Sequence, residues 1–109
     1  MIMNIQRLRN LTTMRLHTEM DHIYEDLEII TGETGLMTHM LPRAMRAVEP
    51  WLREHVTDSR FWDGKYDVTH TGELALPTPS DDDRKAMFER YAAQPNPLEG
   101  KNVIGVLIK

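Results

Sequence analysis

Apolar residues recur at alternating spacings of four and three along two stretches of the chain, and each stretch predicts an amphipathic helix. The first helix is expected over residues 13–31, with Thr12 or Thr13 as its N-cap and Gly32 ending it in the left-handed conformation. The second helix is expected over residues 36–56. The apolar positions are Leu16, Met20, Ile23, Leu27 and Ile30 in the first helix, and Met37, Leu41, Ala44, Val48, Trp51 or Leu52, and His55 in the second.

The segment between these two stretches is short and bounded by glycines, reading Thr-Gly-Glu-Thr-Gly over residues 31–35. Short connections favour antiparallel neighbours, so residues 12–56 are expected to form an antiparallel helical hairpin. Pro42 suits the first turn of a helix, where its missing N–H group has no partner to lose. Pro50 lies inside the second pattern and is expected to kink the helix or split it.

Turn-forming residues dominate the loop-rich segment 57–80, which contains one short candidate strand at Glu73–Leu76. Ser80 followed by three aspartates is typical of a helix start, and the third helix is expected over residues 81–93. Residues 103–108 form a second β-rich run.

A strand needs a partner, and either Glu73–Leu76 or Met1–Ile5 is available to residues 103–108. The predicted fold class is therefore α+β, mainly α: an antiparallel helical hairpin, a third helix and a small two-stranded β element. The 109 residues suffice for one modest core, so a single domain over residues 1–109 is expected.

Composition excludes several classes of protein. The chain has no cysteine, which removes disulfides, cysteine-ligated metals and thiol nucleophiles. No apolar run approaches the roughly 20 residues of a membrane span. The first residues lack the apolar core of a signal peptide, so a cytoplasmic location is expected.

Charge is unevenly distributed. The net charge is −4; the first 15 residues hold Arg7, Arg9 and Arg15, whereas residues 19–33 hold six acids and no lysine or arginine. A basic footprint is absent overall, which argues against direct nucleic-acid binding. The three N-terminal arginines, with Arg43 and Arg46, leave nucleotide binding as an alternative.

Three carboxylates of the first helix, Asp21, Glu25 and Glu28, fall on one face that points away from the apolar stripe; we call them the acidic ridge. No lysine or arginine at i,i+4 spacing in the helix neutralises them. They predict electrostatic docking to a partner protein with a basic surface, and the alternative is an ordinary solvated face. Additional contacts are expected from the neighbouring residues Glu19, His22, Asp26 and Ile29.

Metal and catalytic motifs are incomplete. Glu19, His22 and Asp26 contain one Glu-x-x-His, but a di-metal bundle needs a second copy and two further glutamates. Glu25 and Glu28 form one carboxylate pair of the kind that holds magnesium in helical nucleotide pyrophosphohydrolases, and no matching pair follows. No nucleophile motif or phosphate-binding loop is present, so we expect no metal, no cofactor and no catalytic residue.

Methionine is frequent, with eight copies, and a methionine-rich face provides an adaptable binding surface. Met20, Met37 and Met45 are expected to fill the core instead. Exposed methionines and Ile29 are the alternative docking surface if the acidic ridge is only solvated.

In its general character the chain resembles the small accessory proteins of tailed phages and prophages, including anti-CRISPR-type inhibitors. It shares with them short length, absence of cysteine, mild acidity and a helical hairpin carrying the acidic ridge. The resemblance implies a stoichiometric inhibitor that binds a host defence complex. The leading hypothesis is a non-catalytic protein-binding module; the alternatives are a nucleotide-binding or nucleotide-hydrolysing protein and a structural homo-oligomer such as a homodimer.

Overall fold

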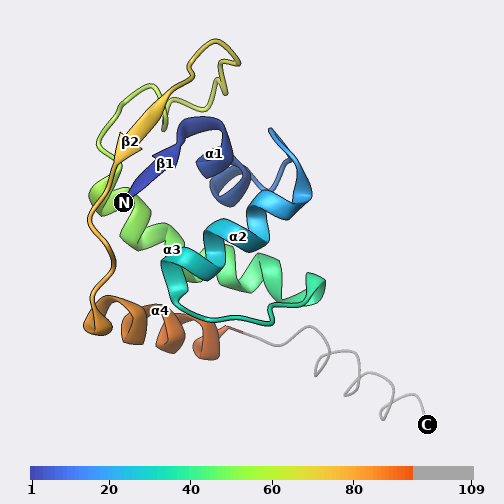
Figure 1. Ribbon diagram of the computed structural model, residues 1–109, viewed down its shortest axis with the longest axis vertical. Helices are drawn as coiled ribbons and strands as arrows, with labels where there is room; N and C mark the ends of the chain where they lie inside the picture. The colour runs from blue at the N-terminus through green and yellow to red at the C-terminus, as the bar shows by residue number, and fades with distance from the viewer. Residues whose placement is uncertain (95–109) are drawn as a thin grey trace, which may run out of the picture.

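The computed structural model describes residues 1–94, and Figure 1 shows their arrangement. The elements are, in chain order, β1 (Ile2–Asn4), α1 (Ile5–Thr13), α2 (Met20–Thr31), the short 3-10 helix η1 (Thr38–Met40), α3 (Leu41–His55), β2 (Glu73–Ala75) and α4 (Asp81–Ala93). Helix α3 contacts each of the other three α-helices and is the centre of the packing. The predicted fold class, α+β and mainly α, is confirmed.

The small sheet joins the N-terminal residues to the segment that precedes α4. Strand β1 pairs antiparallel with β2, with Ile2 opposite Ala75 and Asn4 opposite Glu73. The sequence analysis offers Glu73–Leu76 and Met1–Ile5 only as alternative partners for residues 103–108, whereas the structure pairs them with each other. The strand predicted over residues 103–108 lies outside the described residues.

Local capping chemistry sets two helix starts. Ser80 and Asp83 form a reciprocal capping box at the start of α4, and the predicted bounds 81–93 are confirmed. The Asn4 side chain accepts a hydrogen bond from the Arg7 backbone N–H and begins α1, a helix that the sequence analysis missed. The signals for α1 are Asn4 as a cap and the apolar residues Ile5, Leu8 and Leu11, all buried.

The start predicted for the first long helix is wrong. Thr12 and Thr13 end α1, and α2 begins only at Met20, after Glu19. Leu16 therefore lies outside any helix and is 58% exposed. The predicted end is confirmed: Gly32 adopts the left-handed conformation, with φ 76°, and Arg84 Nε lies 3.2 Å from the position that a Cβ atom would take.

Helices α2 and α3 do not form the expected antiparallel hairpin. Met20 and Ile23 at the start of α2 line the same depression as Leu41 and Met45 at the start of α3. In Figure 1 both helices run from right to left, and the connection between them passes back beneath α2. The connection covers nine residues, 32–40, instead of the expected five, and is therefore long enough to return the chain to the start of α2 before α3 begins.

Helix α3 runs through Pro50 without interruption, so the predicted split is wrong. Pro42 occupies its first turn as expected. On either side of Pro50, α3 buries Val48, Trp51 and Leu52, and this packing holds the helix together despite the lost backbone hydrogen bond. No helix in residues 1–94 is long and apolar enough to cross a membrane.

Candidate protein-binding surface

The acidic ridge lies on the side of α2 that faces away from the core. Ile23, Leu27 and Ile30 are buried on the opposite side of the helix. Asp21 and Glu25 are exposed and Glu28 is half-buried. Within residues 1–94, Asp21 and Glu28 form no ion pair, so their charge faces solvent.

Arg7 of α1 reaches the neighbouring part of α2 and changes the roles of two predicted contacts. Its guanidinium donates to both Asp26 carboxylate oxygens, at 3.0 and 2.9 Å, and to Glu25 Oε2 at 2.8 Å. The ridge is thus partly neutralised at Glu25. Asp26 is only 4% exposed, so it supports the α1–α2 packing and is not available to a partner.

Burial and pairing act in opposite directions at this ion pair. Burial raises the pKa of Asp26, and the hydrogen bonds from Arg7 only partly oppose that effect. Burial also acts to lower the pKa of Arg7, but its hydrogen bonds to Asp26 and Glu25 outweigh it and leave the pKa raised. The two-pronged geometry identifies a charged, structural pair.

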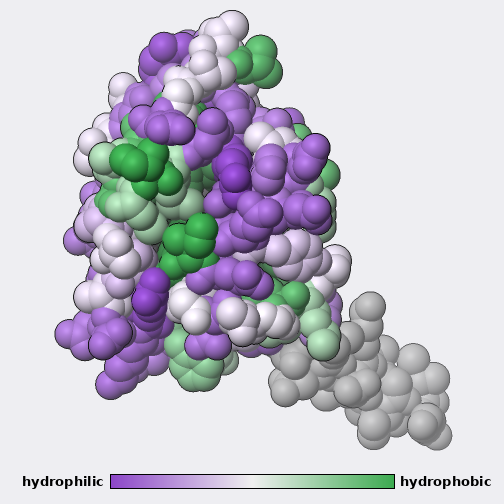
Figure 2. All heavy atoms as spheres, in the orientation of Figure 1, coloured by the Kyte–Doolittle hydropathy of each residue, from purple (hydrophilic) through white to green (hydrophobic). Residues whose placement is uncertain are grey.

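An apolar depression of about 360 Å³ lies beside the start of α2; we call it the apolar hollow. Its rim carries Met14, Leu16 and Met20, which are 53%, 58% and 39% exposed. Figure 2 shows green residues on the left and at the centre of the face in view, and only a few at the right-hand edge beside the α1–α2 connection. Clustered apolar side chains of this kind mark interaction sites more often than single exposed ones do.

The connection that carries Met14 and Leu16 is held in place by a buried side chain. Asn10 is 1% exposed; its Oδ1 accepts from the backbone N–H groups of His17 and Thr18, and its Nδ2 donates to Thr18 Oγ1. Met14 ends α1 with φ 60°, a left-handed conformation that costs a non-glycine residue about 1–2 kcal/mol. Glycine is the usual residue there, so a strained methionine with an exposed side chain points to a role outside the core.

The remaining predicted contacts surround these two features. Glu19 is exposed, and Ile29 is 51% exposed on the outer side of α2. The His22 ring hydrogen-bonds to Thr18 Oγ1. No group of three or more potential metal ligands occurs within the described part of the chain.

Two of the three N-terminal arginines are engaged within the molecule, whereas Arg15 is exposed. Arg7 is paired with α2, and Arg9 is completely buried. Arg9 donates to the Asp67 carbonyl and to His70 Nδ1, so the other ring nitrogen, His70 Nε2, carries the proton and donates to Asp58 at 2.7 Å. This buried chain of contacts fastens the 57–72 loop to α1, and sequence spacing could not reveal it because the partners lie about 50 or 60 residues apart.

Comparison with known proteins gives one match. A family model described as "Domain of unknown function (DUF7736)" matches residues 3–62, which is more than half of the chain. No curated protein and no solved structure matches the chain. The matched range contains α1, α2 and α3, and with them the acidic ridge and the apolar hollow.

Proposed function

We propose that this chain, which belongs to the DUF7736 family, is a non-catalytic module that binds a protein partner through the apolar hollow and the adjoining acidic ridge. The observation that carries the proposal is the hollow's rim: Met14 and Leu16 are exposed on a connection fixed by Asn10, beside the partly exposed Met20 at the start of α2. Such a rim offers apolar area without requiring the loop to become ordered on binding.

The ridge indicates what the partner's surface carries. Met20 and Asp21 are consecutive residues at the start of α2, so apolar and acidic groups lie side by side. The carboxylates of Asp21 and Glu28, which form no ion pair within residues 1–94, complement lysine or arginine on the partner. The fitting partner is a surface, such as an amphipathic helix, with an apolar stripe and a basic edge. In the setting that the phage-type resemblance implies, it belongs to a host defence complex.

A designed probe tests this chemistry. We would titrate the ¹⁵N-labelled protein with a short amphipathic helical peptide built from leucine and lysine, and with a matched leucine–glutamate peptide. We expect the basic peptide alone to shift the signals of Met14, Leu16, Met20 and Asp21. Shifts centred elsewhere, or equal binding of both peptides, would contradict the proposal.

Charge variants separate the ridge from the net charge of the protein. The Asp21→Lys/Glu28→Lys variant should weaken binding of the basic peptide at low salt, and the difference should shrink as salt screens the charges. The control, Glu54→Lys/Glu89→Lys, makes the same change in net charge at exposed positions of α3 and α4. Equal loss in both variants would show that only overall acidity matters. A dimer that buries Leu16 against a second copy would instead favour the homo-oligomer.

A further inference from the structure

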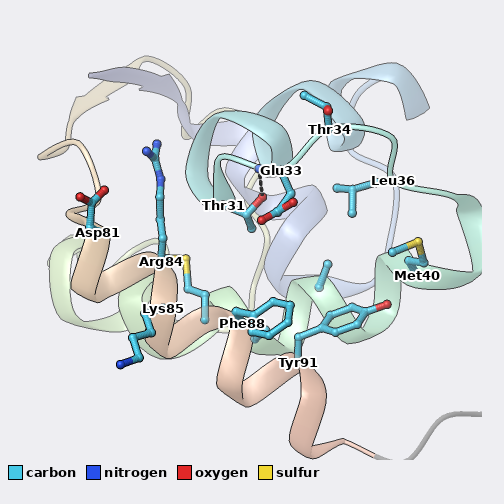
Figure 3. Close-up of a pocket in the computed structure, with 13 residues that line it drawn as sticks. Thr31, Glu33, Thr34, Leu36, Met40, Asp81, Arg84, Lys85, Phe88 and Tyr91 are labelled. Atoms are coloured by element: carbon cyan, nitrogen blue, oxygen red, sulfur yellow. Dashed lines mark hydrogen bonds between the residues drawn. The ribbon is translucent and has the colours of Figure 1, made fainter.

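A second depression, about 380 Å³ in volume, lies between α4, α3 and the 32–40 connection; we call it the α4 groove. Figure 3 shows Phe88 and Tyr91 of α4 on the same side of the groove, with Leu36 and Met40 across from them. Phe88 is 64% exposed, although it sits among other apolar groups. The described residues leave this apolar surface uncovered.

The chain leaves the described structure at one end of this groove. Arg43 of α3 donates to the carbonyls of Tyr91 and Gln94, and the Gln94 side chain donates back to the Arg43 carbonyl. These contacts fix Gln94 next to the groove wall formed by Tyr91. Residues 95–109 begin from that anchored point.

We propose that residues 103–108 of the chain bind in the α4 groove of the same molecule. The segment Val-Ile-Gly-Val-Leu-Ile supplies five aliphatic side chains for the groove's apolar wall. The eight residues 95–102 can span about 26–29 Å, whereas the 13 residues of α4 extend about 20 Å. The segment therefore reaches any part of the groove.

Charge at the groove rim agrees with this occupant. Glu33 and Asp81 line the groove and are exposed; Arg84 and Lys85 line it as well, and the Arg84 guanidinium donates to the Ile29 and Ile30 carbonyls. Lys101 and Lys109 flank the apolar segment in the sequence. Two basic residues thus bracket a segment proposed to enter a groove with acidic groups on its rim. The proposal is independent of the partner-binding surface on α2.

The absence of cysteine makes a distance experiment direct, because one introduced cysteine carries a unique spin label. We would place a nitroxide on Asn102→Cys in the full chain and record the methionine methyl signals. Met40 and Met87 report on the groove, Met3 on the sheet, and Met14 and Met20 on the apolar hollow. We expect the strongest relaxation enhancement at Met40 and Met87.

Binding must be distinguished from simple nearness of a tethered segment. Phe88→Asp should lower the equilibrium constant for closure about tenfold, and the enhancement at Met40 should fall with it. Val68→Asp is the matched control, because Val68 is 76% exposed and lies outside the groove. An enhancement unchanged by Phe88→Asp would overturn the proposal.

Other occupants give other results. If the strongest enhancement is at Met3, the segment lies on the sheet. If it is at Met14 or Met20, the segment lies in the apolar hollow. Either result overturns the proposal. Mixing spin-labelled chains with separately isotope-labelled chains tests for a second copy. Enhancement at Met40 in that mixture would show exchange between molecules and would overturn an intramolecular site.

Discussion

The contacts of Arg7 predict that two adjacent acids contribute very differently to stability. Arg7 binds both, but the Asp26 side chain is 6% exposed and the Glu25 side chain 58%. Asp26→Asn retains the shape but turns an amide N–H group towards the guanidinium, and so removes one of two charged hydrogen bonds. Breaking a fully buried pair costs about 3–5 kcal/mol.

That value is an upper bound here for two reasons. Arg7 retains its ion pair with Glu25 in the variant, and the Arg7 side chain is 27% exposed to water. We therefore expect Asp26→Asn to lower the free energy of unfolding by about 2 kcal/mol, or the Tm by roughly 8 °C. Glu25→Gln removes an exposed pair and should cost about 0.5 kcal/mol or less.

Urea unfolding followed by circular dichroism and by tryptophan fluorescence measures both variants on the same scale. Equal effects, or a loss below about 0.5 kcal/mol for Asp26→Asn, would refute the assignment of Asp26 to the α1–α2 interface. Peptide binding at the apolar hollow provides the second measurement. Asp26→Asn should leave it unchanged under conditions where the variant is folded.

Three further predictions concern the core, acid stability and metals. Leu27→Ala should cost about 3–4 kcal/mol in urea unfolding because Leu27 is fully buried, whereas Leu16→Ala should cost about 0.5 kcal/mol or less; similar losses would contradict the assigned faces. The backbone N–H of Arg60, followed by the His70 ring, lowers the pKa of Asp58, so the stability this provides is complete above about pH 4 and is lost as pH falls through the lowered pKa. Thermal melts at pH 7, 4 and 3 should show the Tm falling with pH, and the fall should be smaller in the Asp58→Asn variant. Calorimetry with zinc, manganese and magnesium should show no tight binding; stoichiometric binding abolished by His22→Ala would contradict this.

Local sequence signals predicted local structure well. The Ser80–Asp83 box, the left-handed Gly32 and the position of Pro42 each depend on chemistry within about one helical turn. Periodicity, in contrast, continued the first helix back through Leu16, since spacing alone does not show where a helix begins.

The misplacement of Asp26 has a different cause. Removing Leu16 and Met20 from the apolar stripe turns its centre by only about 13°, and Asp26 still lies about 67° from that centre. Asp26 is nevertheless buried with Ile23, Leu27 and Ile30. Arg7 makes this burial possible, and no pattern within α2 reveals a partner that lies on another helix.

Asn10 has a consequence for the thermodynamics of association. A connection between two helices is usually a place where binding must first restrict the chain, and that loss of conformational entropy weakens affinity. Here three hydrogen bonds from one buried amide already fix the connection at His17 and Thr18. A partner that docks on Met14 and Leu16 therefore binds a surface that was already ordered when the protein folded. An Asn10→Ala variant should bind with a larger entropic penalty.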